Sequence, residues 1–417
     1  NFLSVSLGWR ISGEKFFQVP WIDDLKIRAN YGTLGNSSIG YWDYQSVINT
    51  APRAVIGSPE NILIGMTQSQ LSNNDLVWEK KTTANVGFDL VALNNRLRFT
   101  AEYFYSKSED LLVYLPILMS SGNEGGAPAV NAGSLENRGV EFEVGWNDKV
   151  GEFEYSASLN ISHLKNKVID LGYGKQNKKI PTYTTLAITE VGQPLGMWYL
   201  YKMLGIFQSE EEIQNYVNSE GKVIQPNARP GDIKYVNVNG DEVVNAGDMT
   251  YLGYGNVPEI VYGINGSLAW KNFDLSFLFQ GAAHAQVYLN GGVVMPYFND
   301  GNLPQFWVKE AWSENNPGTR YPRLEQSTHN FPNTDFPPVQ TYLYDASYFR
   351  LKNIEVGYNF PRKWLSNLRL ENVRVYVSGQ NLFTITDVPQ IDPENVNSQG
   401  WSYPQMKSFN AGISIQF

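Results

Sequence analysis

The chain ends Phe409-Asn410-Ala411-Gly412-Ile413-Ser414-Ile415-Gln416-Phe417, and this stretch decides between two kinds of β-protein. Large or small apolar residues occupy every second position, and small or polar residues fill the gaps. That alternation predicts a β-strand with one apolar face. The strand could close a barrel that crosses a membrane, or it could lie at the edge of a soluble sheet. The rest of the chain has to separate these two interpretations.

The composition allows a membrane barrel and excludes a membrane-spanning helix. No run of about 18 apolar residues occurs in the 417-residue chain, as a spanning helix would need. The strands of a membrane barrel alternate instead, so they average to the modestly polar mean hydropathy of −0.32 seen here. Aromatic residues make up 14% of the chain, which suits a barrel with a ring of aromatic side chains at each membrane surface.

Several functional classes are excluded or disfavoured by the composition and the motifs. The absence of cysteine rules out a disulfide scaffold and a cysteine-based zinc site. A formal net charge of −9 argues against nucleic-acid binding. No metalloprotease, nucleophile-elbow or phosphate-loop motif is present, so we expect no enzymatic activity.

Alternating segments recur along the whole chain and predict antiparallel strands. Tight turns are expected at Asn94-Asn95, Asp148-Lys149 and Lys271-Asn272, within short connections at 94–95, 148–152 and 271–272. A change of phase between Leu351 and Ile354 predicts a β-bulge. The predicted strands cover 3–11, 25–31, 84–90, 97–105, 140–146, 155–161, 262–270, 273–279, 348–358, 373–383 and 409–417.

Two further patterns favour a barrel over a β-sandwich, which would also alternate. The apolar face carries aromatic residues near strand ends and aliphatic residues in the middle, as a lipid-facing wall does. Short turns alternate with long connections, at about 34–80, 108–136, 166–196, 205–258, 283–345 and 385–405. We expect short helices within these long loops, near 209–217 and 304–312.

Six motifs, in this order along the chain, resemble the TonB-dependent transporters, and more closely the SusC/RagA-like importers of Bacteroidota. They are Asn74-Asp75-Leu76-Val77-Trp78-Glu79-Lys80, Asn137-Arg138-Gly139-Val140-Glu141, Gly255-Asn256-Val257-Pro258-Glu259, Trp312 to Leu324 with Asn316-Pro317 and Pro322-Arg323-Leu324, Ser347-Tyr348-Phe349-Arg350-Leu351-Lys352-Asn353 and Gly379-Gln380-Asn381-Leu382-Phe383.

The resemblance implies an all-β fold, a transmembrane antiparallel β-barrel with long extracellular loops. In this family the barrel has about 22 strands, of which residues 1–417 would supply the C-terminal ~14. We expect the signal peptide, TonB box, plug domain and first strands to lie outside this chain. The spacing of Asn410, Gly412, Ile415 and Phe417 resembles the signal that the barrel assembly machinery reads, so we expect Phe417 to be the natural C-terminus.

The implied function is import of nutrient oligomers, either oligosaccharides or peptides, across the outer membrane of a Gram-negative bacterium. Such a barrel lies in outer-membrane lipid, works with a SusD-like surface lipoprotein, and is driven by TonB through the plug. No cofactor is required. Two alternatives remain open from the sequence: a passive porin-like channel, and a soluble glycan-binding β-sandwich.

Two groups of residues are candidates for binding. Oxygen donors at Asn237, Asn239, Asp241, Asn245 and Asp248, with the backbone carbonyl of Val243, have the spacing of a calcium loop, so a structural calcium is possible. Glu242 replaces the usual glycine, and a turn held by its own side chains is the alternative. Aromatic residues of the long loops could stack on cargo: Tyr41, Trp42, Tyr44, Trp401 and Tyr403.

Overall fold

The computed structural model describes most of the chain. The described residues are 2–38, 40–114, 128–172, 179–182, 186–290, 292–297, 301–324, 339–366, 370–395 and 402–417.

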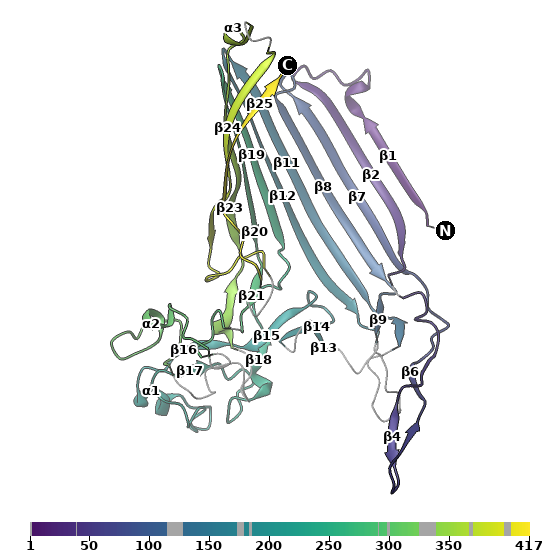
Figure 1. The fold of residues 1–417 in the computed structure, drawn as a ribbon, viewed down its shortest axis with the longest axis vertical. Helices are drawn as coiled ribbons and strands as arrows, with labels where there is room; N and C mark the ends of the chain where they lie inside the picture. Colours follow the sequence, from purple (N-terminus) through teal and green to yellow (C-terminus); the bar gives the residue numbers. More distant parts are fainter. Residues whose placement is uncertain are drawn as a thin grey trace.

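One antiparallel sheet of 11 strands dominates the structure (Figure 1). Strands that follow one another in this sheet along the chain are also neighbours in space, so the topology is a simple up-and-down meander. The strands are β1 (Ser4–Arg10), β2 (Ile22–Asn36), β7 (Glu79–Ala92), β8 (Leu97–Glu109), β11 (Ser134–Val150), β12 (Phe153–Asp170), β19 (Ile260–Trp270), β20 (Phe273–Ala283), β23 (Tyr348–Asn359), β24 (Asn372–Thr386) and β25 (Ser408–Gln416).

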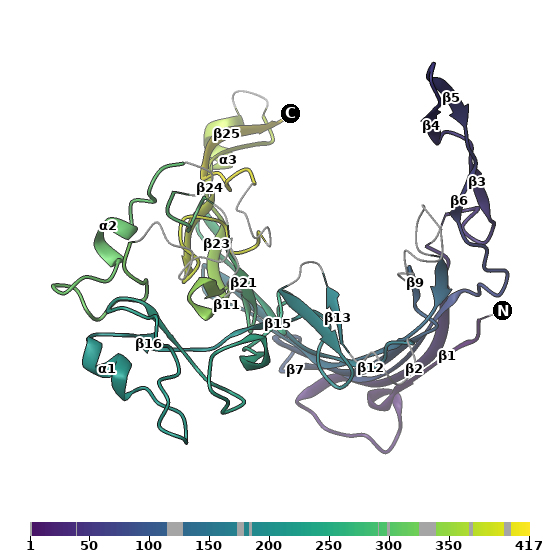
Figure 2. The ribbon, with the colours of Figure 1, turned by 90° about the horizontal axis from the view of Figure 1, so that it is seen from below.

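The sheet curves into an open trough with a concave and a convex face (Figure 2). Its two edges, β1 and β25, border the open side of the trough and do not pair with each other. This single curved wall confirms the expected barrel-type sheet. No second large sheet covers it in the described residues, because the other sheets contain only two to four strands. A β-sandwich would need such a second layer.

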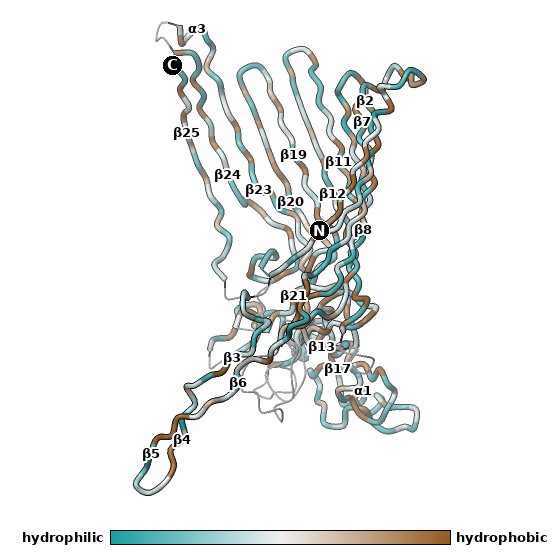
Figure 3. Tube along the Cα trace, turned by 90° about the vertical axis from the view of Figure 1, so that its right-hand side faces the viewer, coloured by the Kyte–Doolittle hydropathy of each residue, from teal (hydrophilic) through white to brown (hydrophobic). Residues whose placement is uncertain are grey.

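Hydrophobic and hydrophilic residues alternate along the strands (Figure 3). Since successive side chains point to opposite faces, this alternation makes one face of the sheet apolar. One cross-strand row runs from Ile27 through Phe88, Ala101 and Phe142 to Ile161. The four large side chains in it are each 36–42% exposed, although they lie in the middle of the sheet. Because a soluble protein would cover such a row, this convex face fits contact with lipid.

Large aromatic side chains gather on the convex side at the end of the sheet where the turns are short. Each is at least 40% exposed, which places amphipathic or flat rings where a membrane surface would lie. On the strands they are Trp9, Phe153, Trp270 and Phe273, and the connections at the same end add the exposed Trp21 and Trp364.

Short connections join the strands at this end. Asn94, Asn95 and Lys271 have positive φ angles, which confirms the turns expected at 94–95 and 271–272. The turn expected at Asp148-Lys149 is wrong: β11 continues to Val150, which pairs with Phe153. The chain reverses at Gly151 instead, with φ +63°, because glycine adopts this left-handed conformation without steric cost. Two longer connections carry η1 (Ile11–Gly13) and α3 (Arg362–Leu365).

The opposite end of the sheet carries long loops with secondary structure of their own. A slender hairpin projects between β2 and β7, and a folded lobe hangs below β12 to β23 (Figure 1). These loop elements are β3 (Val47–Asn49), β4 (Arg53–Ile56), β5 (Asn61–Ile64), β6 (Thr67–Gln70), β9 (Leu112–Tyr114), β10 (Ala129–Asn131), β13 (Lys179–Thr182), β14 (Ala187–Glu190), β15 (Met197–Tyr201), β16 (Met203–Ile206), α1 (Glu210–Asn215), β17 (Ile233–Tyr235), η3 (Ala246–Asp248), β18 (Met249–Tyr251), β21 (Gln286–Tyr288), α2 (Trp307–Glu310), η6 (Gln340–Tyr342) and β22 (Leu343–Asp345).

Other expectations are settled by these boundaries. The helices α1 and α2 lie where short loop helices were expected, with the Ser209 hydroxyl accepting the Glu212 N–H at the start of α1. The register shifts between Leu351 and Asn353, which confirms the bulge. The main sheet has 11 strands in the described residues, not about 14, because that number assumes one strand per ~30 residues along the whole chain. The lobe takes up much of the chain without adding a strand to this sheet. Among the described helices, none is long and apolar enough to cross a membrane.

Candidate functional site

The concave face is polar along the same strands that are apolar outside. The row one position away from the apolar row contains Lys26, Asp89, Thr100, Glu143 and Asn160. A side-chain period of two places these groups inside the trough, since successive residues of a strand point to opposite faces. The trough is therefore a water-filled or protein-filled lumen, not an apolar core.

Two ion-pair networks tie neighbouring strands together across this face. On β2, β7 and β8, the Arg28 guanidinium lies 2.5 Å from Glu102 and 3.3 Å from Asp89. On β20, β23 and β24, Arg374 pairs with Asp274 and lies 2.7 Å from Glu355.

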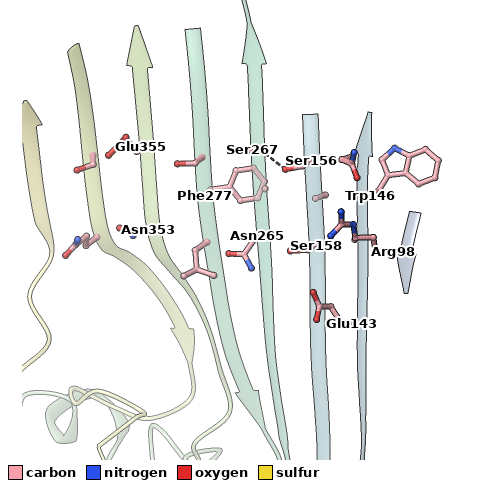
Figure 4. Close-up of a pocket in the computed structure, with 18 residues that line it drawn as sticks. Arg98, Glu143, Trp146, Ser156, Ser158, Asn265, Ser267, Phe277, Asn353 and Glu355 are labelled. Atoms are coloured by element: carbon pink, nitrogen blue, oxygen red, sulfur yellow. Dashed lines mark hydrogen bonds between the residues drawn. The ribbon is translucent and has the colours of Figure 1, made fainter. Parts of the chain in front are cut away.

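Two hollows of about 590 Å³ and about 580 Å³ lie on the concave face. The first is lined by side chains that include Arg98, Glu143, Ser158 and Asn265, and Trp146 points away from it (Figure 4). Neither Arg98 nor Glu143 forms an ion pair with any residue that the structure describes, whereas Ser156 and Ser267 bond to each other at 2.7 Å. The wall thus retains charges that are available to another group.

The lobe at the long-loop end has a hydrophobic core independent of the sheet. Leu200, Ile233, Tyr288, Trp307 and Tyr342 are fully buried in it. Two side chains of the family-like loop hold the lobe together. The Trp312 indole N–H donates to the Gln208 side chain at 2.9 Å, and the Arg323 guanidinium pairs with the Asp232 carboxylate at 2.9 Å. Burial, helped by the charge of Asp248, raises the pKa of Tyr201 to about 12. These loops are therefore an ordered structure at the mouth of the trough.

The residues proposed for calcium do come together, in a turn between β17 and β18. Asp248 is fully buried, and its carboxylate accepts backbone N–H groups of Val238 (2.7 Å), Asn239 (3.3 Å) and Asn245 (2.8 Å). The Asp241 carboxylate accepts the side-chain amides of Asn239 (2.9 Å) and Asn245 (2.6 Å). Every carboxylate oxygen thus already has an N–H donor, so the turn closes on its own hydrogen bonds.

The other donors of this turn have similar partners. Asn237 accepts the Gly240 N–H at 2.7 Å, and the Val243 carbonyl accepts the Asn245 amide at 3.2 Å. Burial is the largest single influence on the Asp241 carboxyl and acts to raise its pKa. The hydrogen bonds from Asn245, Val243 and Asn239 together outweigh it, so the pKa of Asp241 is lowered. Calcium would require the Asn239 and Asn245 amides to turn their oxygens inward, and it stays a prediction. Among the described residues, no three His, Asp or Glu side chains cluster as metal ligands would.

The aromatic candidates are exposed loop residues. Tyr41 is 93% exposed and Trp42 is 66% exposed. They lie in a turn in which the Asp43 carboxylate accepts the Gly40 N–H at 2.9 Å. The rings of Trp42 and Tyr44 lie 6.5 Å apart between centroids. Tyr403 is 83% exposed, and within the described part of the chain no ring contact joins it to that pair. Trp401 lies outside the described residues.

The residues of the proposed assembly signal lie on the edge strand β25 and directly after it. Phe417 is 84% exposed and Ile415 is 45% exposed on the convex side, while Asn410 pairs with Ser378 on the concave side. Gly412 lies against the ring of Tyr376 on β24, and a Cβ there would come within 2.4 Å of that ring. Glycine is therefore required for close approach, an arrangement that pins strand register.

The ionic contacts of the lumen wall were not predictable from the sequence, since they join residues far apart in the chain. Arg350, which is 1% exposed, pairs with Asp392 and Glu394 more than 40 positions away. The motif that contains Arg350 was the one available signal, and Asp392 and Glu394 carried none.

A curved up-and-down sheet with a lipid-type outer face, a polar lumen and ordered loops at one end defines the wall of an outer-membrane β-barrel. A family model described as "TonB dependent receptor-like, beta-barrel" matches residues 3–382. The chain belongs to this family of transporters, which are not enzymes, and its place is the outer membrane.

Relatives and solved structures agree with the SusC/RagA-like resemblance. The chain is 30% identical to TonB-dependent receptor P26 of Formosa agariphila, with 99% of the chain and 42% of that protein covered. It is 26% identical to TonB-dependent receptor SusC of Bacteroides thetaiotaomicron, covering 100% and 40%. A chain in the structure of the RagAB peptide transporter is similar with a TM-score of 0.79 and 25% identity, covering 100% and 43%. The chain thus spans about two fifths of each.

Proposed function

We propose that the chain forms the C-terminal part of the wall and mouth of a TonB-dependent importer of nutrient oligomers. The observation that carries this proposal is the charged concave wall below ordered loops, in a chain of the TonB-dependent receptor family. The rest of the protein would supply the plug, the TonB contact and the first strands, since the relatives are more than twice as long.

Arg98 and Glu143, which form no ion pair within the described part of the chain, support a lumen that holds another charged body. In an importer this is the plug while the channel is shut, and cargo or water while it is open. Lumen charges without an internal partner remain hydrated and can exchange partners at small cost, because exposed ion pairs are weak. A wall built only for stability would not need them.

The proposed partner is a SusD-like surface lipoprotein, and the proposed cargo is an oligosaccharide or a peptide. The similarity to the RagAB peptide transporter favours a two-protein assembly and makes peptides the first cargo to test. Oligosaccharides are the second cargo to test, because the SusC/RagA-like resemblance implies either kind of oligomer. In the proposal, Tyr41, Trp42, Tyr44 and Tyr403 contact cargo at the mouth, as does Trp401.

Uptake by the full-length protein in its own outer membrane tests the function. Cells are given labelled oligopeptides or oligosaccharides, and accumulation is compared with and without TonB. We expect accumulation that is lost without TonB, and co-purification of a lipoprotein. Glu143→Gln should lower uptake, while Val144→Leu, one position along β11 on the convex face, is the matched control. Uptake that persists without TonB would refute the importer.

A passive porin-like channel is the second candidate, because an open polar lumen alone would conduct small solutes. Single-channel conductance of the full-length protein in a planar bilayer separates the two. A steady large conductance without TonB supports the channel, and a closed barrel supports the importer.

A further inference from the structure

Arg350 on β23 is the most deeply buried charged side chain of the sheet's inner face among the described residues, with 1% of its surface exposed. Its guanidinium lies 2.7 Å from the Asp392 carboxylate and 2.5 Å from the Glu394 carboxylate. Its Nε donates to the Thr384 hydroxyl on β24 at 2.9 Å. A buried guanidinium needs such full pairing, because an unpaired charge in this position is strongly unfavourable.

Two more residues of the same strand converge on Glu394. The Tyr348 hydroxyl donates to it at 2.9 Å, and the Lys352 ammonium lies 3.5 Å from it. Positions 348, 350 and 352 share one side of β23 up to the bulge, after which Asn353 and Glu355 take over that side. The bulge therefore ends a three-residue basic and hydroxyl surface, which we call the β23 clamp.

The carboxylates belong to the connection between β24 and β25. The Glu394 N–H donates to the Asp392 side chain at 2.9 Å, and this turn aims both carboxylates in one direction. Val388 is buried in the lobe core, with Ile391 packed against it. Residues 387–395, which we call the latch, therefore join the lobe to the lumen wall.

We propose that the β23 clamp is a carboxylate-binding site that holds the latch against the wall and thereby fixes residues 387–395 at the mouth of the barrel. This gives the family-like motif Ser347-Tyr348-Phe349-Arg350-Leu351-Lys352-Asn353 a physical task, which is to bind two acidic residues supplied in cis. Arg350 is a positioning residue, since it contacts the latch and not the cargo.

The ion pairs make the contact between the β23 clamp and the latch specific for one orientation of the latch. Apolar residues of similar volume would pack the same space with equal or greater stability, so a buried cluster of this kind is a device for orientation. When Arg350 is neutralised, Asp392 and Glu394 lose their counter-charge and are better solvated by water. The latch then leaves the wall while the strands remain paired, because no backbone hydrogen bond of β23 depends on the guanidinium.

A glutamate-specific protease detects the detached latch, since the peptide bond that it cleaves after Glu394 lies in the latch. The full-length protein in outer-membrane vesicles is digested, and the fragment 395–417 is quantified by mass spectrometry. We expect Arg350→Met to release this fragment at least about tenfold faster than the wild type, because cleavage follows the population of the open form. Arg374→Met is the matched control, as it breaks ion pairs to Asp274 and Glu355 at the other end of the wall.

The proposal would be overturned if Arg350→Met released fragment 395–417 no faster than the wild type. It would also be overturned if Arg374→Met accelerated the release as much as Arg350→Met does. If Arg350→Met fails to assemble, Tyr348→Phe removes only the hydroxyl and should still accelerate release measurably. A second measurement, cargo uptake by the Arg350→Met variant, rests on the proposed function. We expect a raised KM for cargo and an unchanged maximal uptake rate. Faster cleavage without any transport in the wild type would refute the import function and leave the clamp intact.

Discussion

Replacing Asp248 by asparagine tests the internal bonding of the 237–248 turn. The wild-type carboxylate is fully buried and accepts three backbone N–H groups, at 2.7, 3.3 and 2.8 Å. Asparagine has the same shape but only one acceptor oxygen. That oxygen can serve Val238 and Asn239, so the NH₂ group then faces the Asn245 N–H, donor against donor.

The cost follows from one lost charge-assisted hydrogen bond and one unsatisfied buried donor. We expect local opening to become easier by about 2–3 kcal/mol. At 1.4 kcal/mol per factor of ten, amide exchange at Val238, Asn239 and Asn245 should accelerate about 30- to 150-fold.

Hydrogen–deuterium exchange of the full-length protein in detergent measures this, with peptides that cover 236–249. Amides of β11 and β12 serve as the internal control, since they lie in the sheet and share no bond with the turn. Unchanged protection of the three amides would show that Asp248 does not hold the turn.

Four further outcomes are expected. Gly412→Val should destabilise the barrel by about 1–3 kcal/mol in urea unfolding, because the new side chain collides with the Tyr376 ring; unchanged unfolding would contradict the close packing. The lobe should lose stability as the pH rises from 10 to about 12, since folded Tyr201 keeps its proton above the ordinary pKa of 10.0; tyrosinate absorbance that rises fully near pH 10 would contradict this. Millimolar calcium should raise the melting temperature of the wild type but not of Asp241→Ala, and no shift would leave a purely hydrogen-bonded turn. Trp42→Ala should weaken cargo binding by about 0.5–1.5 kcal/mol in calorimetry, whereas equal binding would exclude a stacking role.

The strands were predictable because each is encoded locally. Alternation in 84–90 and 97–105 marks β7 and β8, and positive-φ residues at Asn94 and Asn95 join them. The bulge after Leu351 was also visible, since a phase change needs no knowledge of neighbouring strands. The turn after β11 lies at Gly151-Glu152, three residues beyond Asp148-Lys149, because Asp148 is a residue type common in turns while Gly151 supplies the left-handed conformation.

The candidate sites were predictable only in part. The Asn and Asp donors of 237–248 do meet, as a short local turn must, but their hydrogen-bond partners became visible only in three dimensions. The Trp42 and Tyr44 rings lie near each other for the same local reason. Alternation located the strands of the wall correctly, and only the estimate of ~14 strands was too high, because it came from the chain length and the long lobe was counted as wall.

The sequence by itself determined the antiparallel strands, the apolar outer face, the family and the asymmetry between short turns and long loops. All of these are properties of neighbouring residues or of ordered motifs. Tertiary structure decided which charges face each other: Arg28 with Glu102, Arg374 with Asp274, and Arg350 with Glu394. Ion pairing falls off with distance in space, not along the chain, so only the register of the curved sheet and the path of the last loop could bring these partners together.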